Sequence, residues 1–286
     1  MDTSVRALDV ALICDAVAEL CQRANYELGA DVTQALQTSR TYERSPLAGR
    51  VLDTIILNAK LANAEQQPMC QDTGTAVVFV GLGQDVHLIG GALCDAINEG
   101  VRRGYRAGCL RNSIVGDPLF SRKNTGDNTP AVIHIELVTG DKVQLTVMTK
   151  GGGAENMSRM QMLTPADGIA GVRAFVIETV ELAGPNACPP VIVGVGIGGT
   201  FDLAPLLAKQ ALLRWVGQPN ADPQLAAFER ELLDAINALG IGPHGFGGST
   251  TALAVHVESY PTHIASLPVA VNLQCGPAAR HRSIVL

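Results

Sequence analysis

Three of the seven cysteines stand in loops that could hold a metal centre. Cys70 lies in Pro-Met-Cys-Gln-Asp-Thr-Gly, Cys188 in Asn-Ala-Cys-Pro-Pro and Cys275 in Leu-Gln-Cys-Gly-Pro. The neighbouring prolines and glycines end regular structure and leave backbone N–H groups near each thiolate, as iron–sulfur ligands require. Successive cysteines are more than 80 residues apart, however, unlike a compact ferredoxin motif. The residues alone leave two interpretations open: a shared metal centre, or three unrelated loop cysteines.

The remaining cysteines indicate core packing and a reducing compartment. Cys14 and Cys21 are seven residues apart on the apolar face of a predicted helix, where a thiol packs as a small hydrophobic group. An odd number of cysteines, scattered over a long chain with no secretory signal at its start, does not predict a disulfide framework. We therefore expect reduced thiols and a cytoplasmic protein.

Three glycine-rich segments bring backbone close to another group: Lys150–Gly153, Gly194–Gly199 and Gly240–Gly248. The second follows a predicted strand and resembles a dinucleotide fingerprint. It departs from G-x-G-x-x-G, and no acidic residue stands where a ribose would need it. Backbone N–H groups that bind an anion are the alternative for the same segment.

Hydrophobic periodicity predicts a mixture of helices and strands. Helices are expected near residues 10–22, 47–64, 90–101, 165–182, 202–214 and 222–239, and strands at 76–80, 131–138, 142–148, 191–195, 252–258 and 269–273. Thr139-Gly-Asp predicts a β-hairpin of the strands on either side of it. The fold class is α+β (mixed α/β), mainly helical over 1–66 and mixed over 67–286, in one domain that spans residues 1–286.

Composition predicts a large buried core and argues against some classes of protein. The chain has 286 residues, of which 47% are apolar and 17% charged, so a large buried core and a large subunit interface are expected. Its longest apolar stretch, Val191–Ala208, is interrupted by four glycines, Asp202 and Pro205, so no membrane helix is expected. The net charge of −6 argues against a nucleic-acid surface but not against a small anionic substrate.

Five motifs in order resemble a known enzyme family. They are Cys70-Gln-Asp-Thr-Gly, Asn124-Thr-Gly-Asp-Asn-Thr-Pro-Ala, Lys150-Gly-Gly-Gly-Ala-Glu-Asn-Met-Ser, Cys188-Pro-Pro with Gly194-Val-Gly-Ile-Gly-Gly-Thr, and Gly242-Pro-His-Gly-Phe-Gly-Gly. Across roughly residues 45–282 the chain resembles the alpha region of class I, iron–sulfur-dependent fumarases and the related tartrate dehydratases. The resemblance implies a 4Fe–4S cluster on Cys70, Cys188 and Cys275, with one open iron that serves as a Lewis acid and makes the enzyme oxygen-sensitive.

The same resemblance implies substrate contacts. Gln71 and Asp72 are expected to face the substrate, with Asp72 as the group that protonates or hydrogen-bonds the departing hydroxyl. The other interpretation of Asp72 is an Asx-turn residue, and both roles can hold together. Arg111 resembles the family's carboxylate-binding arginine; otherwise it is a surface cation. Gly151, Gly152 and Gly153 would donate N–H groups to a substrate carboxylate.

Two further basic regions resemble family features. His263, twelve residues before Cys275, matches a catalytic histidine near the substrate, whereas a lone histidine is otherwise more often structural or on the surface. Arg280-His281-Arg282 matches a basic run that would steer anions or contact a subunit, with solvated tail residues as the equal alternative. His244 receives no role.

The chain ends eleven residues after Cys275, and nothing in it resembles the second region that supplies the catalytic base in single-chain relatives. We therefore expect a separate beta subunit, an alpha2beta2 assembly, and little activity from this polypeptide alone. The leading hypothesis is an alpha subunit that interconverts fumarate and (S)-malate, as in the tricarboxylic acid cycle. L-tartrate and mesaconate are alternative substrates, and a non-catalytic iron–sulfur sensor and a nucleotide-binding module are the other classes.

Overall fold

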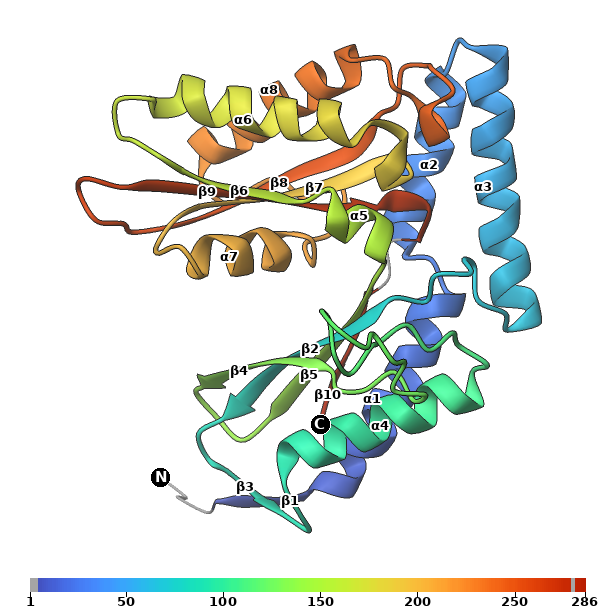
Figure 1. The fold of residues 1–286 in the computed structure, drawn as a ribbon, viewed down its shortest axis with the longest axis vertical. Coiled ribbons are helices and arrows are strands. Elements are labelled where there is room, and N and C mark those ends of the chain that lie inside the picture. Colours follow the sequence, from blue (N-terminus) through green and yellow to red (C-terminus); the bar gives the residue numbers. More distant parts are fainter. Residues whose placement is uncertain (1–4, 279–280) are drawn as a thin grey trace. The chain divides into compact units, whose positions relative to one another are not determined.

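A computed structural model describes residues 5–278 and 281–286. Contacts between Cα atoms divide the chain into two compact units, each built from separate segments. Unit 1 comprises Met1–Glu27, Leu61–Gly152 and Arg280–Leu286, and unit 2 comprises Leu28–Lys60 and Gly153–Ala279. Both units combine helices with sheets (Figure 1), which confirms the predicted mixed α+β class. That the whole chain acts as one catalytic domain stays a proposal.

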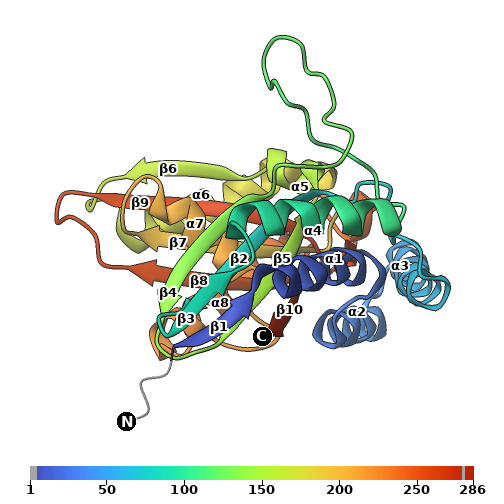
Figure 2. The ribbon, with the colours of Figure 1, turned by 90° about the horizontal axis from the view of Figure 1, so that it is seen from below.

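Unit 1 is a sheet covered by two helices. Its strands are β2 (Thr75–Gly83), β4 (Val132–Val138), β5 (Val143–Lys150) and β10 (His281–Val285), in the order β10-β5-β2-β4. The short strands β1 (Arg6–Asp9) and β3 (Val86–Ile89) form a separate parallel pair. Helices α1 (Val10–Tyr26) and α4 (Leu93–Ala107) lie side by side (Figure 2) and bury apolar side chains against β2 and β5.

Helices α1 and α4 approach each other closely because two glycines face the contact. A Cβ on Gly100 would lie 2.6 Å from the Cys14 carbonyl oxygen, and one on Gly104 would lie 2.6 Å from that of Ala18. Cys14 and Cys21 are buried in this interface, as predicted, and burial raises the pKa of the Cys21 thiol to about 12. Neither thiol is therefore suited to be a ligand, which requires a thiolate.

The predicted β-hairpin is wrong. Strand β2 lies between β4 and β5, parallel to β4 and antiparallel to β5. The connection over residues 139–142 passes around the end of β2, where Gly83 N–H donates to the Lys142 carbonyl at 2.9 Å and Gln84 N–H donates to that of Val138 at 2.8 Å. The turn residues were correctly identified, but they close around an intervening strand from much earlier in the chain.

Unit 2 has a four-stranded sheet with helices on both faces. The strand order is β6-β9-β7-β8, with β6 (Arg159–Leu163), β7 (Val191–Gly198), β8 (Ala252–Tyr260) and β9 (Leu267–Cys275). Helices α6 (Gly168–Ala183) and α8 (Pro223–Ala238) cover one face, and α7 (Leu203–Ala211) lies on the other (Figure 1). Helices α2 (Ala30–Tyr42) and most of α3 (Pro46–Glu65) also belong to unit 2.

The middle glycine run serves helix–sheet packing. The predicted turn after residue 195 begins only at Gly198, since β7 continues to that residue. Within β7, a Cβ on Gly194 would lie 2.0 Å from the Ala208 carbonyl oxygen, and one on Gly196 would lie 2.1 Å from that of Ala204. These glycines let α7 sit directly on the strand, so the resemblance to a nucleotide-binding loop has a structural cause.

Short elements account for most of what periodicity missed. Strands β1, β3, β6 and β10, helix α2 and the short helix α5 (Gly152–Asn156) had no clear signal. Each has 13 residues or fewer, so its pattern completes few periods. Within the described residues, no helix is both long enough and apolar enough to span a membrane.

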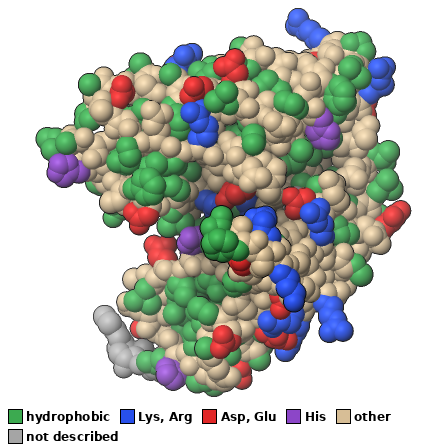
Figure 3. All heavy atoms as spheres, in the orientation of Figure 1, with side chains coloured by type: hydrophobic (Ala, Val, Ile, Leu, Met, Phe, Trp, Pro, Cys, Tyr) green, Lys and Arg blue, Asp and Glu red, His purple; other side chains and the backbone are tan. Residues whose placement is uncertain are grey.

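Apolar side chains also remain on the surface. Leu119, Phe120 and Ile264 are 72%, 87% and 91% exposed. The face drawn in Figure 3 carries hydrophobic side chains among acidic and basic ones. Such exposure fits a chain that has partners, which is the expectation raised by its composition.

Unit 2 buries an ionic network beside His256. Arg214 pairs with the buried Glu229 and, at 3.2 Å, with Glu258. His256 is 2% exposed, and its Nδ1 lies 3.1 Å from the Ala211 carbonyl oxygen. Burial, assisted by the Arg214 charge, lowers the pKa of His256 to about 4.

This pKa predicts a loss of stability in acid. Between pH 6.5 and 4 the unfolded chain takes up a proton at His256 that the folded chain does not, so the free energy of unfolding falls as the pH is lowered, by roughly 3 kcal/mol in total. His256→Gln should lack this dependence in urea titrations followed by Trp215, the single tryptophan, which lies in the same unit. Replacement of the exposed His87 by Gln is the control. Parallel pH curves for the wild type and His256→Gln would contradict the assignment.

Candidate active site

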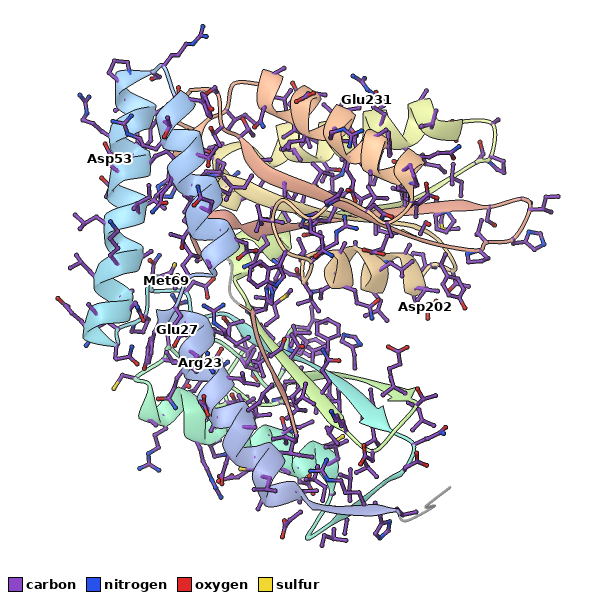
Figure 4. All side chains as sticks on the ribbon, turned by 180° about the vertical axis from the view of Figure 1, so that it is seen from behind. Arg23, Glu27, Asp53, Met69, Asp202 and Glu231 are labelled. Carbon is purple, nitrogen blue, oxygen red and sulfur yellow. The ribbon has the colours of Figure 1, made fainter. Side chains whose placement is uncertain are left out.

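In unit 1 the Cys70 loop is held by its own backbone and by Asp72. Before the loop, Met69 N–H donates to the Asn25 carbonyl at the C-terminal end of α1, at 3.0 Å. Figure 4 shows Met69 near Arg23 of that helix and Glu27, which follows it. Asp72 Oδ1 accepts the Gly74 N–H at 3.1 Å, which is an Asx turn, and Oδ2 accepts the Gly152 N–H at 2.8 Å. One carboxylate therefore shapes the cysteine loop and joins it to the glycine segment.

Gly74 is required by this arrangement. Its φ is +77°, and a Cβ there would lie 2.7 Å from the carbonyl carbon of Lys150. The buried Tyr105 hydroxyl lies 2.8 and 2.9 Å from the carbonyl oxygens of Thr73 and Gly74 and donates to this pair. The cysteine loop is thus fixed against β5 and α4.

Arg111 is attached to the same loop through its backbone. Thr73 Oγ1 donates to the Arg111 carbonyl at 3.0 Å. The fully buried Asn128 donates to the Gly74 carbonyl at 3.1 Å and accepts the Ser113 N–H at 2.7 Å. Unit 1 therefore brings together six predicted site residues: Cys70, Gln71, Asp72, Arg111, Gly151 and Gly152.

Sequence reasoning gave Asn128 no role, although it lies in the quoted motif Asn124-Thr-Gly-Asp-Asn-Thr-Pro-Ala. Its neighbour Asp127 carries a strong electrostatic signal. Burial opposes ionisation there, but hydrogen bonds from Thr129 and Arg102 prevail and lower the pKa of Asp127 to about 2. A permanently charged Asp127, bound to Arg102 at 2.8 Å, fixes the turn that carries Asn128. An asparagine between an aspartate and a threonine was the available signal.

In unit 2, Cys188 and Cys275 lie at the same end of the sheet. Strands β7 and β9 are antiparallel neighbours, and Val191 at the start of β7 pairs with Cys275 at the end of β9. Cys188 precedes Val191 by three residues, in the left-handed conformation with φ of +54°. Sheet register alone therefore gathers two of the three predicted ligands.

The loop that carries Cys188 is fixed through the carbonyls of its two prolines. Pro189 O accepts the His244 N–H at 2.7 Å, and Pro190 O accepts the Gly276 N–H at 2.8 Å. A Cβ on Gly276 would lie 2.3 Å from Pro190 O, so only glycine fits after the third cysteine. The third glycine segment thus has a structural function, since its His244 anchors the Cys188 loop by its backbone.

His263 lies at the other end of the unit 2 sheet. It belongs to the connection between β8 and β9, where its Nδ1 accepts the Ala265 N–H at 3.2 Å, and it is exposed. It lines a cavity of about 490 Å³ together with Ile169, Phe228 and Leu267. The nine residues of β9 separate it from Cys275, a span of roughly 26 Å at about 3.3 Å per residue. Within unit 2, the structure does not bring His263 to Cys188 and Cys275.

The basic run near the C-terminus is partly structural. Arg280 lies outside the described residues. Arg282, on β10, donates to the Glu27 carbonyl at 2.7 Å and to its carboxylate at 3.2 Å. Burial opposes ionisation of Glu27, but Arg23 and Arg282 prevail and lower its pKa. Arg282 therefore fastens the last strand to the end of α1.

The three loop cysteines are more accessible than the two that pack in the core. Among the described residues, no three His, Cys, Asp or Glu side chains are grouped to hold one metal ion. Cys188 is exposed and Cys70 and Cys275 are half-buried, whereas Cys14 and Cys21 are buried. None of the seven, all within the described chain, is in a disulfide. Accessible thiols on Pro- and Gly-bounded loops have the environment that iron–sulfur ligands require.

Comparison with known proteins finds a family and relatives that match most of the chain. The profile of the family described as Fumarate hydratase (Fumerase) matches residues 14–285. A protein of Methanocaldococcus jannaschii named "Putative L(+)-tartrate dehydratase subunit alpha" is 41% identical over 268 residues, which cover 92% of this chain and 94% of that protein. The L(+)-tartrate dehydratase subunit alpha of Escherichia coli K12 is 32% identical over 277 residues, covering 96% and 91%. The matched region includes every residue of the candidate site.

Proposed function

This chain belongs to the fumarate hydratase (Fumerase) family of hydro-lyases, and from that premise we propose that it is the cluster-bearing alpha-type subunit of an enzyme that interconverts fumarate and (S)-malate. The observation that supports this most is the pair of hydrogen bonds from Gly74 and Gly152 to Asp72, which joins the Cys70 loop to the glycine segment. A sensor needs only ligands; a hydro-lyase also needs substrate-binding groups beside them.

Cys70, Cys188 and Cys275 are the proposed ligands of a 4Fe–4S cluster. Three thiolates leave one iron without a protein ligand. When the cluster is bound, this iron supplies a Lewis acid that polarises the C–O bond of a 2-hydroxy acid. The protein's part is to hold the thiolates. The Asx turn does so for Cys70, and the His244 and Gly276 hydrogen bonds do so for the end of the sheet that carries Cys188 and Cys275.

Most of the proposed substrate-binding residues lie in the Cys70 loop or are attached to it by hydrogen bonds. The Arg111 guanidinium is the proposed partner of one carboxylate, by two parallel N–H···O bonds. Gly151 and Gly153 offer N–H groups to the carboxylates, while the Gly152 N–H already donates to Asp72. Gln71, whose Oε1 lies 3.7 Å from Cys70 Sγ, orients the hydroxyl of the substrate. Asp72 positions these groups and, when its carboxyl carries a proton, donates a hydrogen bond or that proton to the departing hydroxyl.

His263 requires a second copy of the chain. Because β9 holds it roughly 26 Å from Cys275, it cannot touch a substrate at the cluster of its own chain. We propose that it acts at the site of the neighbouring alpha chain, in an alpha2beta2 assembly whose beta subunit supplies the catalytic base. Both relatives described above are named as alpha subunits, which supports the existence of that partner.

L(+)-tartrate is the second candidate substrate, favoured by the names of these two relatives. It differs from malate by one hydroxyl, which needs one extra hydrogen-bonding group in the site. Mesaconate, which is fumarate with one extra methyl group, is the third candidate.

The ligand set predicts a selective effect of cysteine replacement. Alanine at position 70, 188 or 275 should abolish the visible absorbance and most of the iron after anaerobic reconstitution, because three thiolates are the minimum that hold the cluster. Alanine at Cys94 or Cys109, both exposed, is the matched control and should leave both signals unchanged. A cluster that requires Cys94 or Cys109 would refute the assignment.

The partner and the substrate are tested together. The reconstituted chain alone should hydrate fumarate at least about 100-fold more slowly than the chain with its beta subunit, since general acid–base catalysis contributes on this scale. The complete enzyme should then be assayed with fumarate, mesaconate and L(+)-tartrate under anaerobic conditions. Full activity from the single chain would exclude an active site divided between two subunits. If the enzyme turned over L(+)-tartrate but neither fumarate nor mesaconate, tartrate would be the substrate in place of fumarate.

Complementation tests the placement of His263. His263→Ala and Cys275→Ala should each be inactive as pure enzymes. Co-expressed, they should recover about a quarter of wild-type activity, because half of random dimers are mixed and each mixed dimer has one complete site. A mixture that stays inactive although mixed dimers have formed would show that His263 does not act across copies.

A further inference from the structure

The short helix α5 contains a charged residue that no catalytic role explains. Glu155 follows Gly152 by three residues and Gly153 by two, so it belongs to the same turn and a half as the glycine N–H groups. Lys209 of α7 forms an ion pair with Glu155 Oε1, and Asn272 of β9 donates to Oε2 at 2.9 Å. Both carboxylate oxygens are thus engaged.

The two partners of Glu155 are themselves fixed. Lys209 has a side chain only 16% exposed, and α7 packs on β7 through Gly194 and Gly196. Asn272 is 7% exposed in a strand with partners on both sides. Glu155 therefore ties α5 to α7 and β9 of unit 2.

Packing alone does not hold Glu155 in this orientation. A cavity of about 230 Å³ borders it and is lined also by Lys209, Asn272 and Met160. Asn272 Oδ1 is buried and has no hydrogen-bond partner among the described residues. Because open space lies next to the carboxylate, its contacts with Lys209 and Asn272 hold its orientation.

We propose that Glu155 is a positioning residue for substrate binding. The first residue of α5 donates its N–H to Asp72, and Glu155 is bound by Lys209 and Asn272. Within unit 2, the contacts of Glu155 fix the turn that begins at Gly153, and this turn offers its N–H to a substrate carboxylate next to that of Gly151. This inference rests on the proposed function, because it assigns those N–H groups to the substrate.

The test compares Glu155→Gln, Lys209→Met and the double variant as complete, cluster-loaded enzymes with the beta subunit. Each single variant should raise KM for the diacid about tenfold and change kcat less than about threefold, because the N–H groups bind ground state and transition state alike. The double variant should be no worse than either single one, since one interaction is lost in each case. Amide hydrogen exchange should become faster at residues 151–155 while iron content and exchange in β7 stay as in the wild type.

Glu231→Gln is the matched control. Glu231 pairs with Arg173 at 2.7 Å on the outer surface of α8 and α6 (Figure 4), and its loss should change neither KM nor exchange at 151–155. An unchanged KM in Glu155→Gln, with or without faster exchange, overturns the proposal, and so does a loss of iron. If the wild-type holoenzyme turned over no diacid, the proposed function would fail, and unchanged exchange in Glu155→Gln would separately overturn the ordering role.

Discussion

The site in unit 1 depends on one carboxylate. Asp72 accepts the N–H of Gly74 within its own loop and the N–H of Gly152 from 80 residues further along the chain, so the cysteine loop and the glycine segment cannot move independently. Tyr105 and Asn128 bind the carbonyls of Thr73 and Gly74 in the same loop, which fixes its C-terminal end. The proposed substrate-binding groups and the proposed cluster ligand Cys70 are thereby joined by hydrogen bonds, and effective catalysis requires such fixed positions.

Sheet register provides the equivalent constraint in unit 2. Because β7 and β9 run antiparallel, the start of β7 lies beside the end of β9. Cys188 and Cys275 are therefore placed at the same end of the sheet. His263 precedes the start of β9, at the opposite end of that strand from Cys275, so the strand separates it from the two cysteines. This separation is the basis for the proposal that His263 acts in a second copy of the chain.

Local signals carried most of the secondary structure into the prediction. The amphipathic period of α1, α3, α6 and α8 was readable because each spans four turns or more, and Cys14 and Cys21 followed from it. The hairpin failed because the partner of β4 lies about 50 residues earlier, information that no local turn contains. The cysteines were found by their Pro and Gly neighbours and chosen by family resemblance. Asn128 and Glu155 were missed because their partners are distant in sequence.

The central claim is that three cysteines of this chain hold a cluster whose fourth iron meets the substrate. Mössbauer spectra of the reconstituted, ⁵⁷Fe-labelled complex, recorded with and without diacid, test it most directly. The account predicts that one iron is distinct from the other three and that only the signal of this iron changes when the diacid binds. In Arg111→Ala, adding the diacid should leave that signal unchanged. Four irons that are equally unaffected by substrate in an active enzyme would contradict it.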